Sequence, residues 1–182
     1  MVSVDRIRSL LQTSTANLQS WRGKEIEKYL LQDLATAKFC IKSLEQRTPV
    51  QIEYIGPFNA KSKTIQAASA IGKKLMLNIP LSETFPAIDG VLVVPTKRFT
   101  PGRIIYAQAT VSREHPINFP QLKDLYSKLT DRFKGYHHIF LFIVPDDIYD
   151  DFAFQPYKNK DGKTRKTKID IPVEQYVGKV CS

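Results

Sequence analysis

The chain has 182 residues, of which 42% are hydrophobic and 25% are charged, as in an ordinary globular protein. This length fits one domain, or one domain with a helical extension. No apolar run approaches the roughly 18 residues that cross a bilayer, so we expect no membrane partner. The 27 Lys and Arg residues outnumber the 18 Asp and Glu residues, and the net charge of +9 favours a polyanionic partner such as nucleic acid.

Amphipathic helices are predicted at the N-terminal end. Apolar residues at helical spacing predict a short helix over residues 3–20, which we assign to an extension covering residues 1–19. The stronger periodicity runs from Ser20 to Leu44 and opens residues 20–182, predicted to form one domain; Ser20 would cap this helix. Glu27 stands in its first turns, where it either offsets the helix dipole or points into a cleft.

Strands are predicted in the middle of the chain. Residues 50–55 alternate in polarity and stop at Gly56-Pro57, which predicts a strand. Residues 61–74 are rich in alanine and bracketed by lysines, a pattern that fits either a short helix or a loop and a strand. Residues 75–80 are again apolar and precede the most informative part of the sequence.

Two β-branched and aromatic runs, Val91–Val94 and Ile104–Ala107, predict adjacent strands joined by a loop. Polar side chains stand at the ends of these strands, where α/β proteins commonly place their chemistry. They are either site residues or simply turn residues and a polar strand exit. These candidates are Asp89 before the first strand and Gln108, Thr110 and His115 after the second.

The C-terminal part predicts a helix, a buried strand and a basic loop. Residues 119–133 place leucines and aromatic residues on one helical face, and Gly135 would end that helix. The continuous apolar run 137–145 predicts a strand buried on both faces, with His137 and His138 on opposite sides, which disfavours a shared metal site. Residues 169–177 fit a final edge strand or a short helix.

Lysine and arginine residues cluster in two segments, which are either solvated surface or phosphate contacts. The second segment, residues 158–168, is an exposed loop with an Asp-Gly turn. The candidate nucleic-acid-binding residues are Lys73, Lys74, Lys158, Lys160, Lys163, Arg165, Lys166 and Lys168. The two cysteines, Cys40 and Cys181, form neither a disulfide framework nor a zinc spacing, so we expect an intracellular, reducing compartment.

The predicted order is a helix, strands near residues 76, 91 and 105, a second helix and a strand near 139. This order indicates an α/β fold with a mixed sheet flanked by helices. It is also the core succession of the restriction-endonuclease-like, PD-(D/E)xK-type, fold.

Four sequence strings resemble the C-terminal domain of Crinkler-type effectors and of the related retrotransposon hot spot proteins, and the resemblance as a whole spans about residues 20–178. The strings are Phe85-Pro-Ala-Ile-Asp89, Tyr106-Ala-Gln-Ala-Thr-Val-Ser112 with His115-Pro-Ile117, Phe142-Ile-Val-Pro145 and Gln175-Tyr-Val177. The Gln-x-Thr-x-x-x-x-His-Pro string is the most distinctive of them.

This resemblance implies a nuclease-like module that acts in host cell nuclei. In the family pattern two carboxylates hold a divalent metal, Mg²⁺ or Mn²⁺, and a lysine orients water. Asp89 takes the first carboxylate position, Gln108 the second and Thr110 the lysine position, so the pattern is incomplete. Glu27 could supply a second carboxylate, Lys73 or Lys74 the cation, and His115 a general base. Members of the family also resemble an NTPase joined to the nuclease, but this chain has no phosphate-binding loop; such a module would belong to a longer parent chain.

Three hypotheses follow from these observations. The first is a Mg²⁺-dependent endodeoxyribonuclease with an atypical Asp and Gln-x-Thr site, acting on double-stranded DNA. The second is a degenerate nuclease fold that binds DNA or a protein partner without cleavage. The third is a protein-interaction domain in which the positive charge is incidental. Salt-dependent DNA affinity separates the third from the others.

Overall fold

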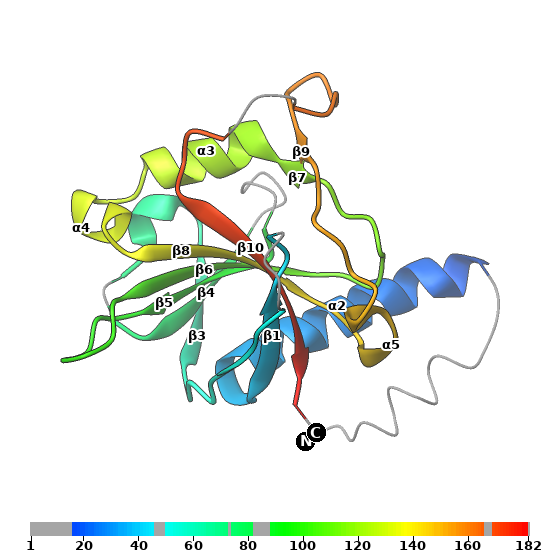
Figure 1. Cartoon of the computed structure of the whole chain (residues 1–182), viewed down its shortest axis with the longest axis horizontal. Helices are drawn as coiled ribbons and strands as arrows, with labels where there is room; N and C mark the ends of the chain where they lie inside the picture. The colour runs from blue at the N-terminus through cyan, green and yellow to red at the C-terminus, as the bar shows by residue number, and fades with distance from the viewer. Residues whose placement is uncertain (1–15, 46–49, 73, 82–87, 166–168, 182) are drawn as a thin grey trace.

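The computed structural model describes residues 16–45, 50–72, 74–81, 88–165 and 169–181, which form a curved sheet with helices on both faces (Figure 1). Residues 1–15 of the predicted N-terminal extension lie outside the described residues. The helices are α2 (Ala16–Thr36), the short 3₁₀ helix η1 (Ala68–Ala70), α3 (Phe119–Ser127), α4 (Asp131–Lys134) and α5 (Asp146–Tyr149). None of them is both long and apolar enough to cross a bilayer.

Eight strands form the main sheet, in the order β2-β1-β10-β8-β6-β5-β4-β3. Their bounds are β1 Phe39–Ser43, β2 Ile52–Ile55, β3 Lys61–Ile65, β4 Met76–Pro80, β5 Gly90–Val94, β6 Arg103–Ala109, β8 His137–Ile143 and β10 Val173–Val180. Strands β6, β8 and β10 are parallel neighbours, whereas β4, β5 and β6 form an antiparallel meander. The short strands β7 (Ile117–Asn118) and β9 (Tyr157–Lys158) pair separately.

The central strands are buried on both faces because a helical layer covers each side. On one face, Tyr106 and Phe140 pack with Leu122 and Leu125 of α3. On the other face, alternate residues of the same strands pack against α2, with Leu34 fully buried. The structure therefore confirms the α/β class and the mixed sheet flanked by helices, and it confirms the strands predicted near residues 76, 91, 105 and 139.

The predicted helix over Ser20–Leu44 is wrong at both ends. The helix α2 already begins at Ala16, so Ser20 lies inside it, and the helix runs unbroken across residues 19 and 20. It ends at Thr36, and residues 39–43 form β1 between β10 and β2. Phe39 and Ile41 alternate with less buried neighbours, as in a strand. This short period of two follows the helical pattern directly, so the sequence alone does not separate the strand from the end of the helix.

Three other predictions need correction or completion. The final segment is a strand, but β10 lies inside the sheet between β1 and β8 and is not an edge. The predicted helix over residues 119–133 is divided into α3 and α4, and Gly135 follows α4 with a right-handed φ of −79°. Residues 61–74 contain a strand, β3, and the 3₁₀ turn η1.

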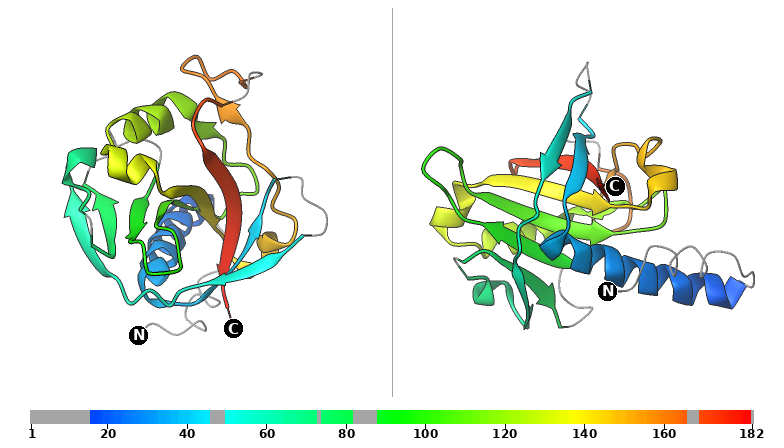
Figure 2. Two further views of the ribbon diagram at one scale, coloured as in Figure 1. Left: turned by 60° about the vertical axis from the view of Figure 1, so that its left-hand side comes forward. Right: turned by 90° about the horizontal axis from the view of Figure 1, so that it is seen from below.

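The two edge strands, β2 and β3, are separated by five residues only, 56–60, although they lie at opposite ends of the sheet order. The segment that joins them therefore crosses one face of the curved sheet and passes over α2 (Figure 2). Its Ala60 N–H donates a hydrogen bond to the Ala35 carbonyl oxygen, 2.9 Å away. This connection therefore packs against the C-terminal end of α2.

Candidate active site

The carboxylate of Asp89 lies where β5 begins and β6 ends. Gly90 pairs with Ala107, and the Asp89 N–H donates to the Ala107 carbonyl oxygen at 2.9 Å, so Asp89 stands opposite Gln108. The Asp89 Oδ2 atom accepts two hydrogen bonds of 2.8 Å, from Gln108 Nε2 and from the backbone N–H of Ala109. The structure thus joins two residues that the sequence places 19 positions apart.

The helix α2 brings a second carboxylate, Glu27, to the same end of β6. Its N-terminal part extends past the ends of the central strands (Figure 1). The Glu27 carboxylate accepts a hydrogen bond from the backbone N–H of Val111, two residues beyond β6, and it is close enough to Asp89 for the two charges to interact. The last residue of β6 and the segment just after it therefore hold the two acidic groups in place through their backbone N–H groups.

Burial perturbs the pKa of both carboxylates, and the charge of Asp89 perturbs that of Glu27 as well. Burial raises the pKa of Asp89, and the hydrogen bonds from Ala109 and Gln108 oppose this only in part. Burial also raises the pKa of Glu27, and the negative charge of Asp89 raises it further. Two half-buried carboxylates that repel each other are stabilised by any bound cation, and perturbed pairs of this kind cluster at functional sites.

Lys24 supplies the positive charge next to this pair, and the sequence reasoning did not identify it. Its ammonium group lowers the pKa of Glu27, three residues further along α2. The spacing of three residues on one helix was an available signal, since such residues share a face. Lys74 lies elsewhere: it precedes β4, whose Met76 pairs with Val93, at the end of β5 remote from Asp89. Lys73 lies outside the described residues.

Thr110 and His115 do not reach the carboxylate pair. Thr110 is 1% exposed, and its hydroxyl accepts a hydrogen bond from the Ser112 N–H at 3.1 Å. The His115 ring packs edge-on against Phe142, with centroids 6.3 Å apart, and burial lowers the pKa of this imidazole. In this structure Thr110 and His115 shape the loop after β6, and neither contacts Asp89.

A buried pair of glutamines anchors this loop, and the sequence analysis missed it. Gln155 accepts a hydrogen bond from the His115 N–H at 2.6 Å and donates to the Arg113 carbonyl oxygen at 3.0 Å. Gln175 in β10 binds the backbone N–H and carbonyl of Gln155 in turn, each at 2.9 Å. Both glutamines are 3% exposed or less. The loop that positions Glu27 is therefore tied to the centre of the sheet.

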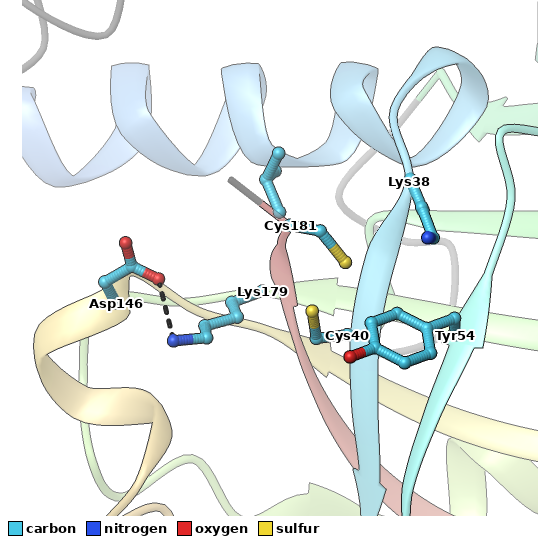
Figure 3. Close-up of a pocket in the computed structure, with 7 residues that line it drawn as sticks. Lys38, Cys40, Tyr54, Asp146, Lys179 and Cys181 are labelled. Atoms are coloured by element: carbon cyan, nitrogen blue, oxygen red, sulfur yellow. Dashed lines mark ion pairs between the residues drawn. The ribbon is translucent and has the colours of Figure 1, made fainter.

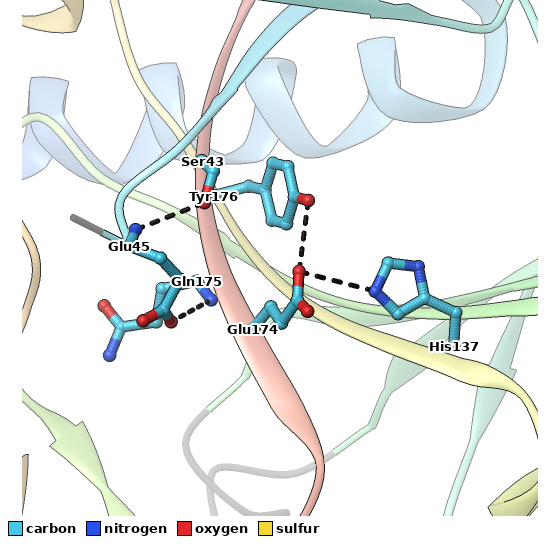
Figure 4. Close-up of polar contacts among 6 residues, drawn as sticks. All are labelled: Ser43, Glu45, His137, Glu174, Gln175 and Tyr176. Atoms are coloured by element: carbon cyan, nitrogen blue, oxygen red, sulfur yellow. Dashed lines mark hydrogen bonds and ion pairs between the residues drawn. The ribbon is translucent and has the colours of Figure 1, made fainter. Parts of the chain in front are cut away.

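The histidine doublet lies on opposite faces of β8, as predicted. His138 is fully buried, and its Nδ1 atom lies 2.9 Å from the Tyr106 hydroxyl. His137 lies on the other face, where its Nε2 atom is 3.6 Å from Glu174, which also accepts a hydrogen bond from the Tyr176 hydroxyl (Figure 4). These residues stand at the beginning of β8 and β10, far from the carboxylate pair at the end of β6.

The predicted basic loop is an exposed turn with Gly162 at a left-handed φ of +77°. Several of its cations have internal partners: Lys158 donates to Thr164, Lys163 pairs with Asp161, and the Arg165 guanidinium lies 4.3 Å from the centre of the Phe119 ring. Lys160 is exposed. Lys166 and Lys168 lie outside the described residues.

No protein-family model, curated protein or solved structure matches the chain. Within the described ranges, no three Asp, Glu, His or Cys side chains gather as a metal-binding group. The donor set at the end of β6 is the two carboxylates, and Gln108 directs its amide nitrogen at Asp89 Oδ2. Mg²⁺ accepts such a set, because it commonly binds through one or two carboxylates and keeps water and substrate phosphate as its other ligands.

Proposed function

We propose that this chain is a divalent-metal-dependent DNA nuclease domain with its site between Glu27 and Asp89. The observation behind the proposal is the pairing of these two carboxylates, from α2 and from the start of β5, in a half-buried position where the charge of one raises the pKa of the other. Mg²⁺ or Mn²⁺ bound there would polarise a phosphate and lower the pKa of a bound water.

The arrangement of elements supports the same reading. The succession α2, β4, β5, β6, α3, β8, with antiparallel β4-β5-β6 and parallel β6-β8, agrees with the restriction-endonuclease-like core expected from the sequence. The Crinkler-type resemblance points to the same class of enzyme. In such a core, the acidic residues belong to two successive strands, and Asp89 and Gln108 take these two positions here.

Each residue of the site has a distinct role in this proposal. Asp89 and Glu27 bind the cation, and the Gln108 amide holds Asp89 in position through Oδ2. Lys24, one helical turn before Glu27, contacts the phosphate of the scissile strand in place of the lysine that Thr110 does not provide. The net charge of +9 supplies the attraction for double-stranded DNA.

A second candidate function is DNA binding without cleavage. Two observations favour it. Thr110 is buried and hydrogen-bonded to Ser112, so it supplies no positive charge. Gln108 is neutral and directs its amide nitrogen at Asp89, so Gln108 adds no negative charge to the site. A fold that kept its basic surface but lost catalysis would show the same features.

Incubation of the purified chain with supercoiled plasmid and Mg²⁺ or Mn²⁺ tests the proposal. We expect nicking that EDTA, Asp89→Asn and Glu27→Gln each abolish, while Glu25→Gln on the same helix retains it. Lys24→Gln should reduce the rate. An intact plasmid whose mobility shifts in a salt-sensitive way would support the binding-only candidate. A plasmid that is neither nicked nor shifted in mobility would refute both candidate functions.

A further inference from the structure

The two cysteines of the chain lie side by side on neighbouring strands. Cys40 belongs to β1, and Cys181 follows the last residue of β10, where its N–H donates to the Lys38 carbonyl oxygen at 2.8 Å. Cys181 therefore stands opposite Lys38, which lies two residues before Cys40, so both cysteine side chains project from one face as diagonal neighbours. Figure 3 shows the two sulfur atoms turned toward each other.

The thiols face an open pocket, so small solutes reach them. It is lined by Lys38, Cys40, Tyr54, Asp146, Lys179, Val180 and Cys181. Both cysteines are partly exposed. Burial and a hydrogen bond with the Cys40 thiol raise the pKa of Cys181 to about 11, against the opposing effect of the charges of Lys38 and Lys179. Cys181 is therefore a thiol at neutral pH and reacts faster as pH rises, because a thiolate is the nucleophile.

We propose that Cys40 and Cys181 are a modification site that hydrogen peroxide converts to an intramolecular disulfide. One thiolate attacks the peroxide O–O bond, giving a sulfenic acid and hydroxide, and hydroxide takes the proton of the second thiol. The second sulfur then displaces hydroxide from the sulfenic acid, and this hydroxide takes up the proton that the first thiol released when it ionised. In total, two thiols and one peroxide give one disulfide and two waters; sulfur is oxidised and peroxide oxygen is reduced.

The bond would fasten the end of β10 to β1. A disulfide requires the two Cα atoms to lie within about 7 Å. Cys181 lies just past the end of β10, where fewer hydrogen bonds between strands oppose a movement of its backbone toward Cys40. The closed loop would run from residue 40 to residue 181 and include strands β2 to β10. Closing so long a loop restricts the unfolded chain strongly, so the oxidised protein should unfold at higher temperature.

The test treats the full chain with hydrogen peroxide, blocks remaining thiols with an alkylating agent and maps the tryptic peptides by mass spectrometry. We expect a peptide linked through Cys40 and Cys181, lost on reduction, and a midpoint of thermal unfolding that rises by roughly 5 °C or more. Cys40→Ser and Cys181→Ser should each remove both effects. Thiols that remain alkylated on both residues, disulfides between two chains, or sulfinic acids without a linked peptide would overturn the proposal. The outcome is independent of nuclease activity.

Discussion

Removing either charge of the Glu27 and Asp89 pair should raise the free energy of unfolding of the metal-free protein. Removing both charges should raise it by less than the sum of the two single increases. Asp89→Asn keeps the two hydrogen bonds from Gln108 and Ala109, because an amide oxygen also accepts them. Glu27→Gln likewise keeps an acceptor for the Val111 N–H. The two variants therefore change charge while conserving shape and hydrogen bonding.

The size of the non-additivity follows from Coulomb repulsion. Two unit charges roughly 6 Å apart repel by about 0.7 kcal/mol at the dielectric constant of water and by about 2.8 kcal/mol at an effective value of 20. Both carboxylates are half-buried, so an intermediate value applies. We expect the increase in the free energy of unfolding of the double variant to be about 1 kcal/mol smaller than the sum of the two single increases at pH 7.5.

The pH dependence has a defined sign. The folded state raises the pKa of both groups, so it holds their protons more tightly than the unfolded chain does. Stability contributed by these groups is therefore present at low pH and is lost as pH rises from about 4 through the raised pKa values. At pH 4 the coupling between the two sites should approach zero.

Urea unfolding of the wild type, both single variants and the double variant, in EDTA, measures this coupling at the two pH values. Glu25→Gln provides the matched control on the same helix and should change the free energy of unfolding by less than about 0.5 kcal/mol. Strict additivity at pH 7.5 would refute the reasoning, because it would mean that the carboxylates do not interact.

Three further variants test how the site is built. Gly90→Ala places a Cβ atom 3.1 Å from leucine side chains of both α2 and β4, so it should force the helix outward and destabilise the fold by about 1 kcal/mol in urea unfolding. Gln155→Ala leaves the His115 N–H without its acceptor and should cost about 1–3 kcal/mol, with faster hydrogen exchange in the loop after β6. Tyr106→Phe removes the hydroxyl next to His138 and should cost a similar amount; unchanged stability would contradict that contact. Because burial lowers the pKa of His138, its contribution to wild-type stability should be lost as pH falls below about 6.5.

The sequence predicted the parts of the fold in which local pattern and burial agree. The runs at β5, β6 and β8 are apolar on both faces and bounded by loops, so they could be assigned without tertiary information. The interior position of β10 could not be predicted, because Gln175 reads as a surface residue. Its amide is satisfied by the backbone of Gln155, a partner 20 residues away.

Part of the candidate site could likewise be predicted from the sequence, namely the part that lies at the ends of the clearly patterned strands. The proximity of Asp89 and Gln108 could be predicted, because they stand at the start and the end of two consecutive strands that pair antiparallel. The proximity of Glu27 depends on the direction in which α2 packs on the sheet, and sequence periodicity does not specify that direction. The nearness of Cys40 to Cys181 required the pairing of β1 with β10, and the mistaken assignment of Cys40 to a helix concealed it.

Isothermal titration of the metal-free protein with Mn²⁺ tests the central claim most directly, because it asks whether the carboxylate pair binds a divalent cation before any substrate is present. We predict one site in the wild type and in Glu25→Gln, with affinity that increases from pH 5 to pH 8 as the carboxylates lose their protons. Asp89→Asn and Glu27→Gln should each abolish that binding. Equal binding in all four proteins, or none in the wild type at pH 8, would contradict the assignment of the metal site to Glu27 and Asp89.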